Sequence, residues 1–207
     1  MCSSDLLLLS QQTTKAADVL ARVAQIAQAL QNKVRERGAV ALLAQAHGML
    51  HNYEAALQMA SRTLQLSQEL KFDRFVPLDI YNVAYFNLQM GRATEALSLF
   101  SKARERANHE DVAFLRELHF HMGVASLRIG EKGNAASSFR EALSHAQKTK
   151  DMRKVMQAAE HLAGIEADRG DKASAVRLLN EAIKAAEAAN LREERKGLRK
   201  KLDDLGG

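Results

Sequence analysis

The sequence has almost none of the residues that build β-rich or disulfide-stapled folds. Tryptophan is absent from the 207 residues, proline and cysteine each occur once, and aromatic residues make up only 5%. The single cysteine, Cys2, excludes an intrachain disulfide and a thiolate metal site. No apolar run approaches the roughly 20 residues that a membrane span needs. We therefore expect no membrane segment and a cytoplasmic location.

The residues that are plentiful favour helices. Ala, Leu, Glu, Lys, Gln and Arg dominate the chain, whereas the strand-forming residues are sparse. Eleven glycines and one proline leave little material for β-turns, so the turns should join helices. The net charge of +5 permits an acidic partner. No basic patch is interleaved with aromatic residues, so we do not expect a nucleic-acid partner.

Three glycines mark an internal repeat. Gly91, Gly130 and Gly170 follow one another at spacings of 39 and 40 residues, and each lies between two amphipathic stretches. Such a glycine is typical of the left-handed residue that ends a helix. One period earlier, His51 occupies the same place. The pattern predicts a series of helix pairs, each joined by a short turn.

Small and large apolar residues recur at fixed distances from these turns. Steps of four and three place the recurring residues of the second stretch on one helix face. They are Ala56, Ala96, Ala135 and Ala175, then Phe100, Phe139 and Leu179, and then Ala103, Ala142 and Ala182. The stretch before each turn carries a small residue that would let two antiparallel helices approach closely. These small residues are Ala44, Ala84, Gly123 and Ala163.

This pattern of large, small, Gly, Ala, Phe and Ala resembles the tetratricopeptide repeat. The long period is similar to that of kinesin light chain and of maltose-regulator-type bacterial activators. The resemblance covers four repeats, at 37–76, 77–115, 116–155 and 156–189. It implies an all-α fold, a right-handed α-α superhelix (solenoid) of antiparallel helix pairs. Asp73, Asp111 and Asp151 lie between the repeats, where each could cap the following helix.

The sequence departs from the family pattern at several positions. The first aromatic residue of each repeat is replaced by Val40, Ile80, His119 and Ala159. The middle tyrosine is replaced by His47, Asn87, Ser126 and Glu166. The proline that closes each repeat is absent. Four repeats in register still favour the same fold.

The two ends lie outside the four repeats. Residues 1–6 resemble an assembly scar, with an ordinary disordered N-terminus as the alternative. Residues 7–36 are expected to form the second helix of a truncated upstream repeat, so an upstream domain of the chain would be missing. Residues 190–207 are expected to form a C-terminal capping helix with one apolar face. That face consists of Leu191, Leu198, Leu202 and Leu205.

No pattern in the sequence indicates catalysis. A phosphate-binding glycine loop and a nucleophile elbow are both absent, so we expect neither an enzyme nor a cofactor. His47 and His51 have the four-residue spacing of a helical metal pair, but no third ligand accompanies them. We therefore expect no metal site.

The resemblance implies a partner-binding groove, because the first helix of each pair lines the concave surface in that family. The corresponding residues are Tyr81, Asn82, Tyr85, Phe120, His121, Arg128 and His161. Aromatic anchors beside amides and charged groups suit a bound peptide. The alternative is that these aromatic residues pack between neighbouring repeats. The family's clamp for a terminal carboxylate is matched only at Asn82, so we do not expect that chemistry.

The resulting hypothesis is a protein–protein interaction scaffold that binds a peptide or protein segment in its concave groove. It would be the C-terminal part of a larger signalling or regulatory protein. An alternative is a ligand-sensing regulatory domain of a bacterial transcription activator or signalling ATPase. Helical-repeat RNA binding is a third reading, which the long period and the lack of a repeated base-reading pair disfavour.

Overall fold

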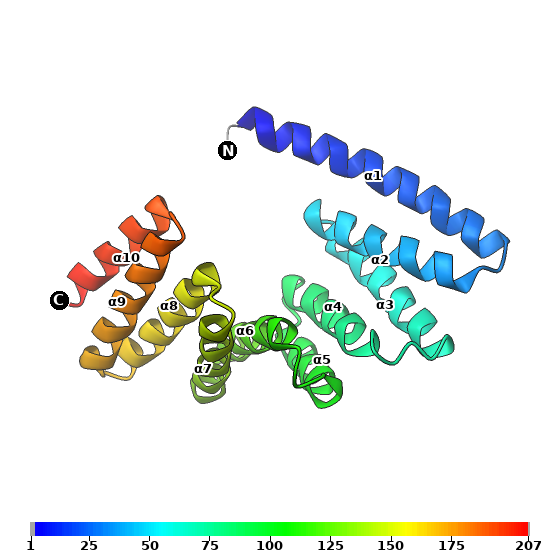
Figure 1. Cartoon of the computed structure of the whole chain (residues 1–207). Helices are drawn as coiled ribbons and strands as arrows, with labels where there is room; N and C mark the ends of the chain where they lie inside the picture. Colours follow the sequence, from blue (N-terminus) through cyan, green and yellow to red (C-terminus); the bar gives the residue numbers. More distant parts are fainter. Residues whose placement is uncertain (1–2, 207) are drawn as a thin grey trace. The chain divides into compact units, whose positions relative to one another are not determined.

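The chain is all-helical throughout the part that the structure describes. The computed structural model describes the backbone of residues 3–206 and the side chains of residues 10–206, with no strand among them (Figure 1). The helices are α1 (Ser3–Ala29), α2 (Lys33–Met49), α3 (Tyr53–Glu69), α4 (Val76–Gln89), α5 (Ala93–Arg106), α6 (Val112–Arg128), α7 (Lys132–Lys148), α8 (Met152–Asp168), α9 (Lys172–Ala188) and α10 (Arg192–Asp204).

The chain divides into two compact units between Arg106 and Ala107. Unit 1 contains the pairs α2–α3 and α4–α5, and unit 2 contains the pairs α6–α7 and α8–α9. Within each unit the second helix of one pair also packs against the first helix of the next pair, as α3 does on α4 and α7 on α8. Helix α1 packs against α2, and α10 packs against α9.

The predicted turns within the pairs are confirmed. Gly91, Gly130 and Gly170 have φ values of 80°, 82° and 84°, in the left-handed region that glycine enters without a Cβ clash. His51 occupies the equivalent turn with a φ of 58°. The glycine-like role that the repeat gives to His51 is therefore also confirmed.

The predicted close approach of paired helices is also confirmed. Ala56, Ala96, Ala135 and Ala175 each expose 0% of their surface. At Gly123 on α6, an added Cβ would lie 2.8 Å from the ring of Phe139 on α7. Phe139 is itself fully buried, so only a glycine fits opposite it at the observed spacing.

The joints between pairs match the prediction in part. Asp111 and Asp151 cap α6 and α8, because their side chains accept hydrogen bonds from the backbone N–H groups of Phe114 (3.0 Å) and Lys154 (3.1 Å). The prediction for Asp73 was wrong, since α4 begins only at Val76 and its capping position is Phe75. The proline in the first turn of α4 accounts for the late start, because proline fits the first helical positions best.

The predicted repeat boundaries lie later than several of the observed helix starts. The boundaries at 36/37, 115/116 and 155/156 fall inside α2, α6 and α8, and the boundary at 76/77 falls just after the start of α4. Only the boundary at 189/190 falls between helices. The joints between pairs contain no glycine with a positive φ. The residues that adopt the left-handed conformation there are Gln31, Lys71, Lys150 and Asn190.

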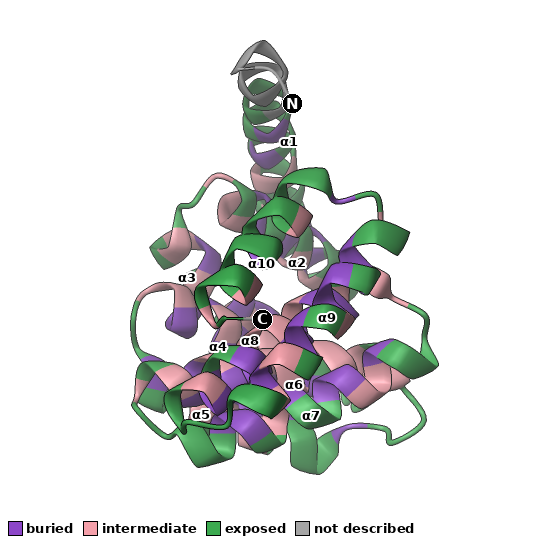
Figure 2. Cartoon of the chain, turned by 90° about the vertical axis from the view of Figure 1, so that its left-hand side faces the viewer, coloured by how far each residue is buried: buried purple, intermediate pink, exposed green. Residues whose placement is uncertain are grey.

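Helix α1 has both buried and exposed residues (Figure 2), and its exposed residues include a stripe of apolar side chains. Thr13, Ala17 and Ala27 are buried. Val19, Val23, Ile26 and Leu30 are 60%, 43%, 60% and 70% exposed. The repeat register equates Val23 with Ala182, which is fully buried in the α8–α9 pair. That an upstream helix precedes α1 stays a prediction. Of the residues predicted to be a scar, 3–6 continue α1, and Met1 and Cys2 lie outside the described residues.

Within unit 2, α10 and its two capping residues pack leucines against the core, and much of the rest of the helix is exposed (Figure 2). Leu191 and Leu198 are 8% and 2% exposed and belong to the core of unit 2, and Leu202 and Leu205 pack against that core. None of the described helices is long and apolar enough to cross a membrane.

Candidate partner-binding groove

The structure places all seven predicted groove residues on first helices of the pairs. Tyr81, Asn82 and Tyr85 lie on α4 in unit 1, and we call them the α4 cluster. Phe120, His121 and Arg128 lie on α6 and His161 lies on α8, both in unit 2. We call Phe120, His121 and His161, with the charged residues around them, the α6–α8 cluster.

The α4 cluster is a pair of stacked tyrosines. The ring centroids of Tyr81 and Tyr85 are 6.4 Å apart at an interplanar angle of 21°. Tyr81 also packs against Phe100 on α5, at 5.6 Å between centroids. Both tyrosines are half-buried. Burial, together with the nearby Tyr53, raises the pKa of Tyr85, so its hydroxyl stays protonated at neutral pH and can donate a hydrogen bond.

In the α6–α8 cluster, Phe120 contacts rings from two other helices. Its centroid lies 5.6 Å from those of Phe139 on α7 and His161 on α8. His161 in turn stacks on Phe139, with centroids 4.6 Å apart and an interplanar angle of 5°. Phe120 is nevertheless only half-buried. Its ring therefore takes part in the packing between neighbouring repeats, which was the alternative reading, and part of the residue stays exposed to solvent.

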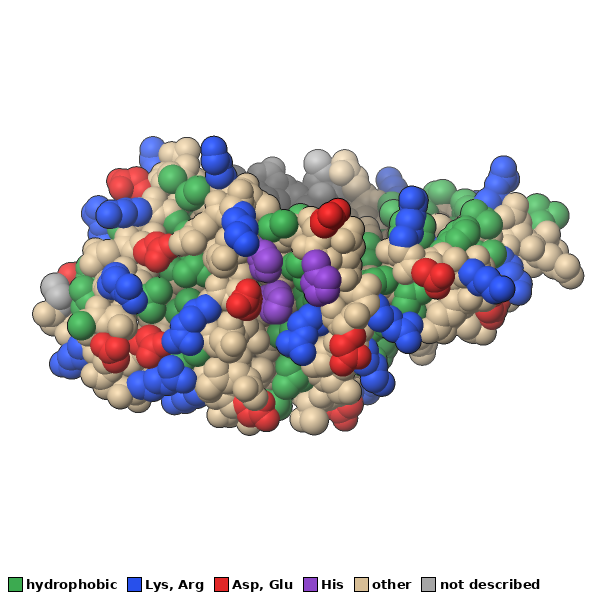
Figure 3. Space-filling view, turned by 60° about the horizontal axis from the view of Figure 1, so that its bottom comes forward, with side chains coloured by type: hydrophobic (Ala, Val, Ile, Leu, Met, Phe, Trp, Pro, Cys, Tyr) green, Lys and Arg blue, Asp and Glu red, His purple; other side chains and the backbone are tan. Residues whose placement is uncertain are grey.

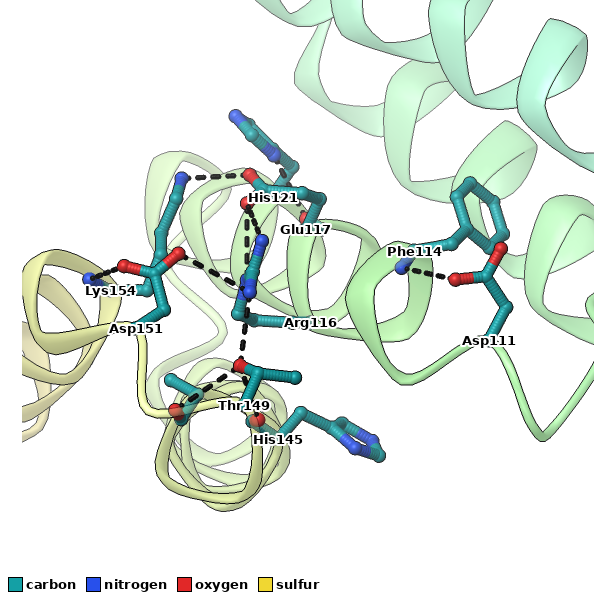
Figure 4. Close-up of polar contacts among 10 residues, drawn as sticks. Asp111, Phe114, Arg116, Glu117, His121, His145, Thr149, Asp151 and Lys154 are labelled. Atoms are coloured by element: carbon teal, nitrogen blue, oxygen red, sulfur yellow. Dashed lines mark hydrogen bonds and ion pairs between the residues drawn. The ribbon is translucent and has the colours of Figure 1, made fainter.

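Charged side chains of α6 and α8 form ion pairs with one another, and Figure 4 shows these contacts. Lys154 donates a 2.7 Å hydrogen bond to the carboxylate of Glu117, and its ammonium lies 4.9 Å from the centroid of the Phe120 ring. Arg116 donates to the same carboxylate (3.1 Å) and pairs with Asp151 at 3.2 Å. These ion pairs join α6 to the start of α8, and the Lys154 ammonium lies beside the half-buried Phe120 ring.

The two histidines of the cluster are neutral at neutral pH. Burial lowers the pKa of His121, and the Lys154 ammonium lowers it further. Burial also lowers the pKa of His161, with a smaller effect in the same direction from Lys201. Nδ1 of His121 lies 2.9 Å from the carbonyl oxygen of Glu117. Since a carbonyl can only accept, Nδ1 carries the proton and Nε2 is the acceptor nitrogen of the ring.

Arg128 and Asn82 lie apart from the ring contacts. Asn82 is half-buried on α4. Arg128 is exposed in the last turn of α6, seven residues after His121, which is about 10.5 Å along the helix axis. Because seven residues span about two helical turns, Arg128 lies on the face of α6 that carries His121 and extends the polar part of that face.

Sequence reasoning missed the charged residues that complete the α6–α8 cluster. Lys154 follows Glu117 by 37 residues, which is three short of the 40-residue repeat period, so the two side chains do not occupy equivalent positions of their repeats. They come together only because α6 and α8 are shifted relative to each other along their axes.

The face in Figure 3 mixes Lys and Arg side chains with Asp and Glu side chains, so neither sign dominates it. Among the residues with described side chains, no group of three His, Cys, Asp or Glu could hold a metal ion.

Comparison with known proteins relates this fold to helical-repeat proteins. No family model and no curated protein sequence matches the chain. Among solved structures, MamA has a TM-score of 0.68 at 13% identity and covers 92% of this chain and 98% of its own. The kinesin light chain TPR-like repeats of Podosopora anserina have a TM-score of 0.66 at 15% identity and cover 89% of this chain and 93% of their own.

A third similar structure is PlcR of Bacillus thuringiensis, in complex with the peptide PapR7 and DNA. It has a TM-score of 0.65 at 11% identity and covers 94% of this chain and 74% of its own. At identities this low, the similarity establishes the fold alone. The all-α helix pairs and the closeness to these structures confirm the predicted fold class: the chain is an α-solenoid of tetratricopeptide-type repeats.

Proposed function

We propose that this protein is a protein–protein interaction scaffold that binds a peptide or protein segment along the first helices of its pairs. The α6–α8 cluster is the observation that carries the proposal. It places a half-buried aromatic ring, a neutral histidine and a pair of opposite charges on two neighbouring first helices.

These groups suit a peptide for separate physical reasons. The exposed part of Phe120 offers apolar contact to a side chain, and such aromatic anchors carry much of the energy in interfaces. His121 lies edge-on to Phe120 with ring centroids 5.4 Å apart, so its ring adds contact area beside that anchor. Lys154 and Glu117 bond to each other across α8 and α6, and a charged peptide can replace one partner of that pair.

Similar structures are compatible with this proposal. The PlcR structure is a complex with a peptide and DNA, so this type of fold can hold a peptide. For this chain we extend only the peptide part of that observation, because the cations of the α6–α8 cluster, Lys154 and Arg116, are each paired with carboxylates and offer no continuous basic field to a nucleic acid.

The first test is a peptide-display selection on the purified protein, followed by affinity measurements on the selected peptides with single variants. We expect His121→Ala and Lys154→Ala each to weaken binding about tenfold, because each removes one favourable contact with the peptide, an aromatic contact for His121 and a charged one for Lys154. Lys184→Ala is the matched control, because Lys184 is an exposed cation on α9, a second helix.

The selection can also refute the proposal. The proposal fails if the selected peptides bind His121→Ala and Lys154→Ala as tightly as the wild type while Lys184→Ala binds them less tightly. It also fails if no peptide is enriched over a selection on an unrelated helical protein. Circular dichroism of each variant checks that the fold is retained.

A further inference from the structure

Unit 2 contains a hollow between the first helix α8 and the last helix α10. Its volume is about 280 Å³, and it is lined mainly by apolar surface. Helix α9 packs against both α8 and α10 (Figure 1) and contributes the buried Leu179 to the lining. The apolar lining on α8 consists of Ala163, Gly164 and Ala167, and α10 contributes Leu205.

The hollow exists because α8 lacks bulky side chains that the other first helices have. One period earlier, on α6, Gly164 is replaced by Val124 and Ala167 by Leu127. On α4 the same two positions carry Tyr85 and Leu88. An added Cβ at Gly164 would meet no atom within 4 Å, so the space beside it is open.

The third lining position shows what is missing. Glu160 on α8 occupies the position that Phe120 has on α6. Phe120 lies against His161 of the next first helix, whereas Glu160 turns to an ion pair with Lys201 on α10, at 2.6 Å. The aromatic ring that packs between α6 and α8 therefore has no counterpart between α8 and α10.

We propose that this hollow binds one large apolar side chain, aromatic or leucine, of a peptide bound to the scaffold. The inference rests on the proposed peptide-binding function and names the specificity that the end of the groove would confer. The occupant takes the place that Phe120 fills one repeat earlier. The volume supports a single side chain, since it lies below the range of about 300–1,000 Å³ typical of pockets for drug-sized ligands.

The charges at the rim add a second preference. Glu160 and Lys201 neutralise each other across the hollow, whereas Asp204 is an exposed carboxylate on the same rim. The rim thus has a surplus of negative charge. A lysine or arginine next to the apolar residue of the peptide would complement Asp204.

The direct test uses the dipeptide N-acetyl-Phe-Lys-amide as the probe and NMR of methyl-labelled protein as the readout. We expect saturable shifts of the methyl signals of Ala163, Ala167 and Leu205, with a dissociation constant in the millimolar range that such a small ligand allows. The dipeptide N-acetyl-Ser-Lys-amide, which lacks the apolar side chain, should bind at least about tenfold more weakly, because burial of that side chain supplies most of the affinity.

Filling the hollow should abolish this binding. Gly164→Val restores the residue found at the same position of α6, and Ala167→Leu is a second filling variant in case the first perturbs α8. Gly133→Val is the control, because Gly133 is an exposed glycine of α7 with nothing within 4 Å of its added Cβ. Asp204→Asn should weaken the Phe-Lys probe and leave a Phe-Gln probe unchanged.

Two results would overturn the inference: the absence of saturable shifts at these methyl groups, or equal binding of the probe by wild type and both filling variants. Neither result would bear on the proposed function itself, which is tested at His121 and Lys154. Conversely, the hollow can bind the probe even if the display selection yields no peptide that depends on the α6–α8 cluster. The two experiments therefore fail separately.

Discussion

The close approach of α6 and α7 at Gly123 makes a sharp stability prediction. Replacing a mid-helix glycine by alanine normally stabilises a helix by about 0.5–1 kcal/mol, because glycine loses more backbone entropy on folding. At Gly164 the new methyl group would meet nothing within 4 Å, so Gly164→Ala should show this gain. At Gly123 it would lie 2.8 Å from two carbons of the Phe139 ring.

The clash at Gly123 cannot be relieved cheaply. Phe139 exposes none of its surface, and its ring stacks on His161 with centroids only 4.6 Å apart. Overpacking a filled core typically costs about 1–3 kcal/mol. After the gain in helix propensity is subtracted, Gly123→Ala should destabilise unit 2 by about 0–2.5 kcal/mol. The two substitutions should therefore differ by about 1–3 kcal/mol and have opposite signs.

Chemical denaturation of both variants and of the wild type would measure this difference. Both glycines lie in unit 2, so one transition reports on both, and the two changes are chemically identical. In a unit of this size each kcal/mol moves the melting temperature by about 4–8 °C, which gives a second readout. If Gly123→Ala stabilised the protein as much as Gly164→Ala does, the proposed packing of α6 on α7 would be wrong.

Three further predictions concern the core, the joints and pH. Ala96→Phe should destabilise unit 1 by more than about 1 kcal/mol in urea denaturation, because Ala96 is fully buried between α4 and α5. Asp111→Ala should lower the free energy of unfolding by about 1 kcal/mol, because it removes a helix cap. Asp151→Ala should lower it by about a few tenths of a kcal/mol more, because Asp151 caps α8 and also pairs with the guanidinium of Arg116 on α6. Equal losses for the two variants would show that this ion pair contributes nothing to stability. The stability of unit 2 should fall as the pH drops from 7 towards 5, since burial lowers the pKa values of His121, His145 and His161 in the folded state and the unfolded chain takes up their protons first. Replacing all three by glutamine should flatten this part of the stability curve.

The helix pairs could be predicted from the sequence because the turns and close contacts use residues with few substitutes. Gly91 stands where the chain needs a left-handed residue, and Ala96 where the paired helix comes too close for a larger side chain. The joints between pairs were harder to predict. Their left-handed residues include Lys71 and Lys150, which carry no signal of that conformation, and this is why several predicted boundaries lie inside helices.

The candidate site could be predicted only in part, for a related reason. The repeat register placed Phe120, His121 and His161 on first helices, and the structure brings these three rings together in unit 2. The register does not give the stagger between neighbouring first helices. The contact of Lys154 with Glu117 depends on that stagger, so it follows from the structure and not from the pattern.

The departures from the repeat pattern also explain how one such chain can acquire a specific surface. In a helical-repeat fold each pair packs mainly on its neighbours, so a change in one pair leaves distant pairs intact. The position filled by Tyr81 on α4 and by Phe120 on α6 is Glu160 on α8, and the ion pair of Glu160 with Lys201 replaces the lost aromatic contact. The fold tolerates this exchange because the buried positions of the same pair keep the residue types of the preceding repeat: Ala175 corresponds to Ala135, and the large apolar Leu162 corresponds to Met122. Variation on the half-buried face of the first helices is thus separated from the core that holds the pairs together, and we expect differences in partner specificity to arise on that face.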